Sequence, residues 1–338
     1  MGVFSPSAPA AARYPDRLRQ GTDALARALG VEVVVPQQAR ERTGFTAGSP
    51  RERAASLEAL IADEDICAIF CTVGGFNSAE ILPYLDAGLL RRRPKPFVGY
   101  SDATALLLGL QALGGWITFH GPAILPQFGE HPHPFAFTVR SLRAALIAGE
   151  RLRPYADPSA WTNEVLEWGT DAWRSRPRRT QAPASRETWK AGRGRGQLFG
   201  GNIETMNLLV GTPYYAPPTD VVLFWEATRE EAYLPRIRRA LTHLRQAGLF
   251  QRTRAMLIGR SPGCVPVDGV TLRDVVLEAV DAFDFPVVAD LAFGHTDPML
   301  TLPIGTSVMV EAVAGDGSAL YPLPDIPAST GSRPGSDR

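Results

Sequence analysis

Residues 66–75, Ile-Cys-Ala-Ile-Phe-Cys-Thr-Val-Gly-Gly, decide the fold, because an apolar run stops here at a pair of glycines. A short apolar run bounded by glycine predicts a buried strand, which we place at Ile66–Thr72. The pattern repeats on both sides, with strands expected at Val31–Val35 and Pro96–Tyr100 and helices at Arg51–Ala62, Ser78–Leu90 and Asp102–Leu113. Strands that alternate with helices predict βαβ units, and therefore a parallel sheet covered on both faces.

A second α/β region follows in the C-terminal half of the chain. Strands are expected at Val221–Trp225, Ala255–Ile258, Pro286–Ala289 and Ser307–Ala312, with helices at Asn202–Val210 and Glu231–Ala247. A length of 338 residues also fits two domains. We expect an N-terminal parallel-sheet domain at residues 1–156 and a C-terminal α/β domain at residues 196–324. Residues 325–338 are rich in Pro, Ser and Gly and predict a disordered tail.

Residues 157–195, between the two regions, show no sustained helical or strand period. This segment contains Trp161, Trp168, Trp173 and Trp189, the basic run Arg174–Arg179 and the glycine-rich end Gly192–Gly196. Disordered segments are poor in aromatic residues, so we interpret residues 157–195 as a connecting linker or a mobile lid over an active site, with a flexible end at Gly192–Gly196. The basic run either meets a phosphate or carboxylate or forms a solvated loop.

The composition excludes several classes of protein. Lys and Arg number 35 and Asp and Glu number 35, so the chain lacks the positive excess of proteins that bind nucleic acid or anionic membranes. The longest uncharged span, residues 103–129, is interrupted by Gly, Pro and Gln and does not predict a membrane helix. Three cysteines without metal-site spacing indicate a reducing compartment. We expect a cytoplasmic protein with no nucleic-acid or membrane partner.

The sequence Gly-Tyr-Ser-Asp-Ala at residues 99–103 lies where an expected strand meets an expected helix. It resembles the nucleophile elbow G-x-S-x-G, with alanine in place of the last glycine. In such an elbow a sharp turn holds the serine hydroxyl clear of the backbone. Ser101 is therefore a candidate nucleophile. The alternative is that Ser101 only caps the helix that begins at Asp102.

A serine nucleophile needs a base, and His295 is the best candidate among the five histidines. It lies in the turn-rich stretch Gly294–Pro298 after an expected strand, and catalytic groups are often placed on such loops. His120 ends an apolar strand and fits a packed structural histidine. The others lie on a helix surface or in a proline-rich loop: His131, His133 and His243.

The base in turn needs a carboxylate that orients it and stabilises its charged form. Glu226 directly follows the strand expected at Val221–Trp225 and therefore projects from a strand end. Glu230 and Glu231 lie a few residues further along and fit equally well. Spacing alone does not choose among the three.

Two glycine-rich turns precede expected helices, at Gly74–Ser78 and Gly200–Asn202. Small residues at such turns let backbone N–H groups point at an anion or a developing oxyanion. A dinucleotide site is a weaker interpretation, because the first turn lacks the G-x-G-x-x-G pattern and the glycine-rich stretch Gly192–Gly196 follows no expected strand. The second turn is suited to holding a carboxylate or an amide of a ligand, or it simply begins a helix.

Together these residues resemble the LD-carboxypeptidase family of serine peptidases over nearly the whole chain. The matching stretches are Ser5–Ser7, Thr72–Gly75, Lys95–Asp102, Thr118–Pro122, Gly200–Asn202, Gly211–Tyr214, Leu223–Glu226 and Gly294–Pro298. Within the family the chain is most similar to the microcin C immunity peptidases. The stretch Gly75–Ser78 and the tryptophan-bearing segment Trp161–Trp189 support this narrower likeness.

The resemblance implies a catalytic triad that assembles across the cleft between the two domains. In it Ser101 is the nucleophile, His295 the base and Glu226 the orienting acid. The resemblance also implies an oxyanion hole formed by the backbone N–H groups of Gly75 and Asp102. Residues expected to contact substrate are Gly74, Asn77, Ser78, Trp168 and Asn202. No metal or cofactor is implied, and a homodimer is expected.

The implied substrate is a peptidyl or aminoacyl nucleotide of the microcin C kind, in which an acidic aminoacyl group is joined to an adenylate-like part. Hydrolysis of its amide or acyl-phosphoramidate bond would give immunity or detoxification. A tryptophan face suits stacking of the base, and we single out Trp168 for this role. One alternative is removal of terminal D-Ala from a cell-wall tetrapeptide. Another is a non-catalytic protein that sequesters a toxic ligand.

Overall fold

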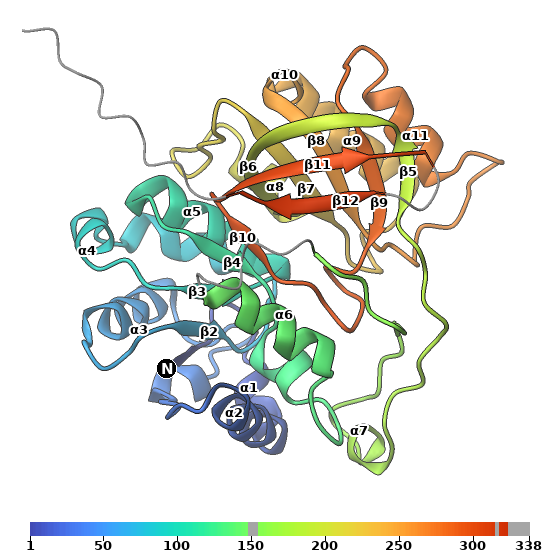
Figure 1. The fold of residues 1–338 in the computed structure, drawn as a ribbon. Coiled ribbons are helices and arrows are strands. Elements are labelled where there is room, and N and C mark those ends of the chain that lie inside the picture. Colours follow the sequence, from blue (N-terminus) through green and yellow to red (C-terminus); the bar gives the residue numbers. More distant parts are fainter. Residues whose placement is uncertain (148–154, 315–317, 324–338) are drawn as a thin grey trace, which may run out of the picture.

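Two β-sheets, each flanked by helices, form the two halves of the molecule (Figure 1). The computed structural model describes residues 1–147, 155–314 and 318–323, so the tail expected at residues 325–338 lies outside the described residues. The predicted fold class, a two-domain α/β protein, is confirmed. The residue limits that we gave for the domains stay a prediction.

The N-terminal sheet contains five strands in the order β1-β2-β3-β4-β10. They are β1 (Gly2–Phe4), β2 (Ile69–Cys71), β3 (Phe97–Gly99), β4 (Thr118–His120) and β10 (Leu302–Ile304). The first four are parallel, as the alternating pattern predicts, and all are buried. The fifth comes from the far end of the chain and pairs antiparallel with β4.

Helices cover both faces of this sheet. They are α1 (Ala10–Arg13), α2 (Pro15–Leu29), α3 (Pro50–Ala62), α4 (Ala87–Arg92), α5 (Thr104–Gly114) and α6 (Ala136–Leu146). Shorter turns are η1 (Gln37–Arg40), η2 (Ser78–Tyr84), η3 (Ser101–Ala103) and the π-helical η4 (Ile124–Phe128). Helix α3 begins at a capping box in which Ser49 and Glu52 exchange side-chain and backbone hydrogen bonds.

The C-terminal sheet contains seven strands in the order β12-β11-β6-β7-β8-β9-β5. They are β5 (Glu187–Lys190), β6 (Gly192–Asn202), β7 (Val221–Glu226), β8 (Thr253–Gly259), β9 (Val287–Leu291), β11 (Ser307–Ala312) and β12 (Ala319–Pro322). The central strands β6 to β9 are parallel, so their carboxyl ends meet at one edge of the sheet. The helices of this half are α8 (Ile203–Leu209), α9 (Leu234–Gln246), α10 (Leu249–Arg252) and α11 (Leu272–Ala279). The short helix α7 (Ala172–Ser175) belongs to the connecting segment and lies near α2 of the N-terminal half (Figure 1).

Two predicted elements of the N-terminal half are wrong. Val31–Val35 is not a strand, because only Val34 forms an isolated bridge, to Gly2 at the edge of the sheet. The single helix expected at Ser78–Leu90 is broken into η2 and α4. Pro83 lies inside η2, and the Asp86 side chain accepts a hydrogen bond from the Gly88 N–H and starts α4. The other expected elements are present with limits shifted by a few residues.

The segment at residues 157–195 is more ordered than its sequence predicts. Its expected flexible end, Gly192–Gly196, is instead the start of β6 and pairs antiparallel with β11, which corrects that prediction. Glycine is required at Gly194, where a Cβ atom would lie 1.8 Å from the Arg254 carbonyl oxygen. The earlier part of the segment runs from one half of the molecule to the other, with Trp173 buried. The glycine-rich sequence of residues 192–196 predicts a flexible end, because glycine does not give the alternation of apolar and polar side chains by which a strand is recognised.

The two halves share one apolar cluster, which extends from Phe4 in β1 to Leu320 in β12. At their contact the backbone N–H of Asn202 donates to the Thr104 hydroxyl, 3.0 Å away. Gly201, with φ 148°, permits this approach, because a Cβ there would lie 2.5 Å from the Thr104 side chain. The end of β6 is therefore held against the start of α5, the helix that follows Ser101. In the part of the chain that the structure describes, no helix is long and apolar enough to span a membrane.

Candidate active site

Ser101 follows β3 on a sharp turn and has φ 62°. This left-handed conformation is unfavourable for a residue with a side chain, because Cβ crowds the next carbonyl oxygen. Gly99 makes room for the turn: a Cβ there would lie 2.8 Å from Cys71 Sγ and 3.1 Å from Ala103 Cβ. Alanine at the last position of the motif fits the same space. The strand–turn–helix geometry is that of a nucleophile elbow, and helix capping is not the role of Ser101, since no side-chain capping bond forms at α5.

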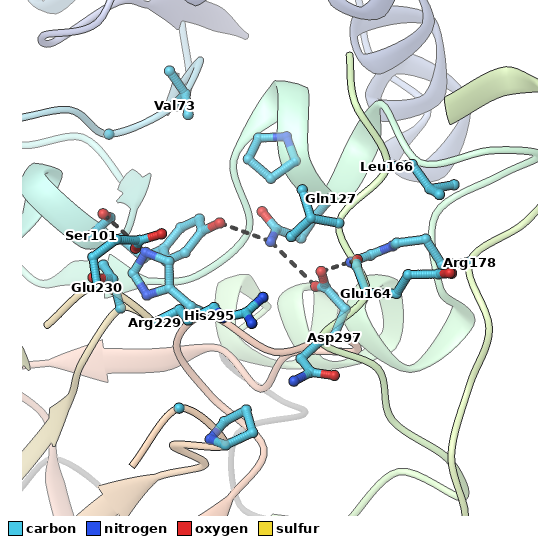
Figure 2. A pocket seen from close by; sticks show the side chains of 18 of the residues that line it. Val73, Ser101, Gln127, Glu164, Leu166, Arg178, Arg229, Glu230, His295 and Asp297 are labelled. Carbon is cyan, nitrogen blue, oxygen red and sulfur yellow. Dashed lines mark hydrogen bonds and ion pairs between the residues drawn. The ribbon is translucent and has the colours of Figure 1, made fainter. Parts of the chain in front are cut away.

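A continuous series of hydrogen bonds joins Ser101, His295 and Glu226 (Figure 2). His295 Nε2 lies 3.1 Å from Ser101 Oγ, and His295 Nδ1 lies 2.6 Å from Glu226 Oε2. Ser101 comes from the N-terminal half, whereas the other two residues come from the C-terminal half. The structure thus brings together, in hydrogen-bonding order, the three residues that the sequence analysis selected for a triad.

Glycine backbones enclose the Glu226 carboxylate, which is completely buried at the end of β7. At Gly294, with φ 92°, a Cβ would lie 2.8 Å from Glu226 Oε2. At Gly259, at the end of β8, a Cβ would lie 2.9 Å from Glu226 Cβ. A methyl group at Gly294 would therefore meet the carboxylate, and one at Gly259 would meet the Cβ atom of the same side chain. These two glycines therefore fix where His295 meets Glu226.

The pKa values of the histidine–glutamate pair move in opposite directions. Burial alone would lower the pKa of His295, but the charge of Glu226 and its hydrogen bond raise that pKa above its usual value. Burial alone would raise the pKa of Glu226, but His295 lowers it below its usual value. The pair therefore favours a charged imidazolium beside an ionised carboxylate, the state that forms when the histidine accepts a proton.

The turn at Gly74 and Gly75 lies against the elbow. A Cβ at Gly74 would lie 3.0 Å from Ser101 Oγ and 3.1 Å from the Asp102 backbone nitrogen. Gly75 has φ 149°, and a Cβ there would lie 2.4 Å from Ser7 Oγ. Among the described residues, the N–H groups of Gly75 and Asp102 have no hydrogen-bond acceptor. Two free N–H donors beside Ser101 Oγ have the arrangement that an oxyanion needs.

A methyl group at Gly74 should impair catalysis without unfolding the protein. Gly74→Ala places its Cβ in the space between Ser101 Oγ and the Asp102 N–H, so we expect kcat/KM to fall about 100-fold, as for a misplacement of about 1 Å at reacting groups. Gly88→Ala, in helix α4, is the matched control and should keep wild-type activity. Equal kcat/KM for the two variants would contradict a reacting centre at this turn.

A cavity of about 1040 Å³ opens in front of Ser101 and His295. Both halves and the connecting segment line it. Of the residues expected to bind substrate or oxyanion, Gly74, Gly75 and Trp168 line this cavity. Its remaining aromatic walls are Tyr100 and Trp173. The volume suits a ligand larger than a single amino acid.

The other expected substrate contacts do not reach the cavity. Ser78 is buried, and its hydroxyl donates to the Asp102 carbonyl oxygen while its N–H donates to the Asp102 side chain. The Asn77 amide donates to Glu80 Oε1. The Asn202 side chain caps α8 and donates to Glu231 Oε2, 2.7 Å away. In this structure these three residues brace the site.

A buried charge network lies beside the triad and was not foreseen from the sequence (Figure 2). Arg178 Nη2 lies 2.6 Å from Glu130 Oε2 and 2.7 Å from Asp297 Oδ2. Gln127 Nε2 lies 3.3 Å from Asp297 Oδ1 and 3.1 Å from the Tyr100 hydroxyl. Arg178 thereby ties the connecting segment to both halves and to the turn that holds His295. The basic run containing Arg178 gave a signal, but its carboxylate partners are distant in sequence.

The basic run therefore pairs with the protein's own carboxylates. Arg176 forms an ion pair with Glu164, and Arg174 forms one with Asp171. The solvated-loop interpretation of this run is wrong for Arg178, whose side chain is only 13% exposed.

His120 is the packed histidine that its strand position suggested. It is completely buried, and its ring lies edge-on to Phe224 at 5.4 Å and to Phe293 at 5.9 Å. Burial lowers the pKa of His120 to about 4, so the ring is neutral. His243 is exposed, as expected, and hydrogen-bonds Asn207. In the described part of the chain, no group of three or more His, Cys, Asp or Glu residues is placed to hold a metal ion.

Comparison with known proteins identifies the LD-carboxypeptidase family, the family that the sequence motifs resemble. The model of the LD-carboxypeptidase N-terminal domain matches residues 1–121, and that of the C-terminal domain matches residues 195–310. A putative carboxypeptidase of Vibrio cholerae is 34% identical over 321 residues, 92% of each chain. The microcin C7 self-immunity protein of Escherichia coli is 31% identical over 315 residues, 92% of this chain and 90% of that protein.

A solved structure of the microcin C7 self-immunity protein, in complex with aspartyl sulfamoyl adenosine, has a TM-score of 0.86 and 30% identity to this chain. The likeness covers 96% of this chain and 95% of that one. The elbow, the strand ends and the two matched domains all agree with this relationship. The chain belongs to the LD-carboxypeptidase family and is a hydrolase of the serine-peptidase type.

Proposed function

We propose that the protein hydrolyses the amide or acyl-phosphoramidate bond of peptidyl or aminoacyl nucleotides of the microcin C type, and so gives immunity or detoxification. The observation that supports this most is the hydrogen-bonded series Ser101–His295–Glu226, which opens onto a cavity walled by Trp168. The likeness to the microcin C7 self-immunity protein supports the nucleotide part of the proposal.

In the first half of the reaction, Ser101 Oγ attacks the substrate carbonyl carbon while its proton passes to His295 Nε2. Glu226 stabilises the imidazolium through the hydrogen bond to Nδ1. The carbonyl oxygen becomes an oxyanion and accepts hydrogen bonds from the free N–H groups of Gly75 and Asp102. The tetrahedral intermediate then collapses, the carbon–nitrogen bond breaks, and His295 gives its proton to the leaving nitrogen.

In the second half of the reaction, water attacks the acyl-enzyme. His295 accepts one proton from the water, and the oxyanion forms again in the same hole. Collapse releases the carboxylic acid and returns the proton to Ser101 Oγ. These steps need no redox or metal chemistry, and we propose no cofactor. A homodimer and a cytoplasmic location stay predictions from the resemblance.

A direct comparison of two substrates tests the proposal. The protein is incubated with an aminoacyl sulfamoyl adenosine and, separately, with an L,D-linked tetrapeptide that ends in D-Ala, and the products are identified by mass spectrometry. We expect release of the amino acid from the first compound. Cleavage of the tetrapeptide alone would reject the nucleotide substrate. It would assign to the protein the LD-carboxypeptidase reaction, which removes terminal D-Ala in cell-wall recycling.

Loss of the Trp168 indole should weaken binding of the nucleotide. Trp168 lines the cavity, with the Arg17 guanidinium 4.5 Å from its ring centre and the Tyr14 ring edge-on at 5.7 Å. Stacking of a base on an aromatic ring is worth about 1–3 kcal/mol, so Trp168→Ala should raise KM at least about fivefold while kcat changes less. Trp189→Ala, which removes a tryptophan outside this cavity, is the control. An unchanged KM would place the base elsewhere.

A further inference from the structure

Glu230 is an acidic residue of the cavity whose carboxylate has no partner among the described residues. It lies in the loop between β7 and α9 and lines the same cavity as Ser101 and His295 (Figure 2). Its side chain makes no hydrogen bond or ion pair with any described residue, and the residue is exposed. The neighbouring Glu231 is different, because Oε2 of Glu231 accepts hydrogen bonds from Asn202 and from the Thr228 N–H.

The other acidic residues that line the cavity are neutralised inside the protein. Glu130 and Asp297 share the Arg178 guanidinium, at 2.6 and 2.7 Å. Glu164 forms an ion pair with Arg176, at 2.7 Å. Among the acidic side chains of the cavity wall, that of Glu230 is thus the one available to a ligand.

The arginines of the cavity wall do not neutralise Glu230. Arg17 donates to the carbonyl oxygens of Leu125 and Pro126, and Arg260 stacks on Trp161 and donates to the Asp290 carbonyl oxygen. Arg229 lines the cavity but forms no ion pair with Glu230 in the structure.

The carboxylates around His295 favour a positively charged ligand group. After the effect of burial, the charges that act most strongly on His295 are those of Glu226, Glu231 and Glu230, and all three raise its pKa. The Glu226 carboxylate already forms a hydrogen bond with His295, and the Glu231 carboxylate already accepts hydrogen bonds from Asn202 and Thr228. A cation beside His295 would therefore be attracted by these three carboxylates, and of them only the Glu230 carboxylate has no partner among the described residues.

We propose that the Glu230 carboxylate binds an ammonium group in the acyl part of the substrate. This inference rests on the proposed function and specifies its substrate class. The ammonium group is either the free α-amino group of an aminoacyl substrate or the end of a basic side chain. Glu230 would repel an acidic side chain, so the acidic aminoacyl group expected from the sequence is disfavoured at this position.

Five acyl sulfamoyl adenosines separate these possibilities: alanyl, N-acetyl-alanyl, lysyl, N-acetyl-lysyl and aspartyl. They are assayed with the wild-type protein, Glu230→Gln and Glu230→Lys. Glu32→Gln is the matched control, because Glu32 is exposed and does not line the cavity. Steady-state kinetics give KM and kcat separately.

We expect wild-type kcat/KM to be about tenfold higher for compounds with the recognised ammonium group, the gain from one charged hydrogen bond. If acetylation of the α-amino group of the alanyl compound lowers kcat/KM, Glu230 binds the α-amino group. If the lysyl compound acetylated on its α-amino group keeps its high kcat/KM, Glu230 binds the side-chain ammonium group. Glu230→Gln should erase the preference mainly through KM, Glu230→Lys should favour the aspartyl compound, and Glu32→Gln should behave as wild type.

Two results would overturn the inference, and they differ. Turnover of the compounds by the wild-type protein with no preference for an ammonium group, unchanged in Glu230→Gln, overturns the role of Glu230 and leaves the proposed function standing. Failure of the wild-type protein to hydrolyse any of the five compounds overturns both.

Discussion

Ser101→Ala is expected to lower kcat by about 10⁴- to 10⁶-fold, because the members of a triad act as a unit and no other hydroxyl replaces Oγ. The fold should survive. Alanine keeps the Cβ atom that Ser101 already places in the left-handed region, so the backbone strain is unchanged. The lost hydroxyl makes one side-chain hydrogen bond, to His295, 3.1 Å away.

Two measurements check this expectation. Single-turnover kinetics with an aminoacyl sulfamoyl adenosine give the chemical step, and thermal unfolding gives a melting temperature that should match the wild type. Protection of a sensitive strain distinguishes hydrolysis from sequestration, since a hydrolase protects at substoichiometric levels and the variant should not protect. Full protection by Ser101→Ala would show that the protein acts by binding its ligand.

Glu226→Gln is expected to lower kcat by about 10³- to 10⁴-fold while leaving the shape of the site intact. The amide has nearly the volume of the carboxylate, but it cannot stabilise the imidazolium and it offers an N–H that favours the wrong tautomer of His295. The space around Glu226 is closed by Gly259 and Gly294, so the new side chain cannot turn away.

The pH profile gives this variant a second readout. In the wild type Glu226 raises the pKa of His295. A base must be neutral to accept a proton, so activity is lost as pH falls through that pKa. In Glu226→Gln the raising charge is gone and the acidic limb should move to lower pH. An unmoved limb with wild-type kcat would show that Glu226 does not orient the base. Glu278→Gln, an exposed glutamate on α11, is the control.

The sequence predicted those parts of the molecule that local patterns encode. Apolar runs ending at glycine identified β2 and β3, because a buried strand must stop where the chain turns. Glu226 ends β7 and His295 lies in the loop after β9, so both lie at the carboxyl edge of the C-terminal sheet, whereas Ser101 follows β3 of the N-terminal sheet. The hydrogen bonds at 3.1 and 2.6 Å agree with that placement.

The parts that escaped prediction depend on partners far apart in the chain. Arg178 looked like one charge in a basic run, since its carboxylates lie 48 and 119 residues away, as the positions 130 and 297 show. Asn202 and Ser78 looked like ligand contacts because polar residues at glycine turns often are. Only the fold shows that the Asn202 amide already donates a hydrogen bond to Glu231 and that the Ser78 hydroxyl already donates one to the Asp102 carbonyl oxygen. Gly192–Gly196 looked flexible because pairing with β11 leaves no local pattern.

The return of β10 to the N-terminal sheet affects how the protein is made. Synthesis proceeds from residue 1, and β4 leaves the ribosome long before Leu302–Ile304. Until then the outer edge of β4 offers unpaired N–H and carbonyl groups, which other chains can recruit into a sheet. The nascent chain therefore has an aggregation-prone edge through translation of the whole C-terminal half. A gene truncated between the two halves would leave that edge open in the finished product.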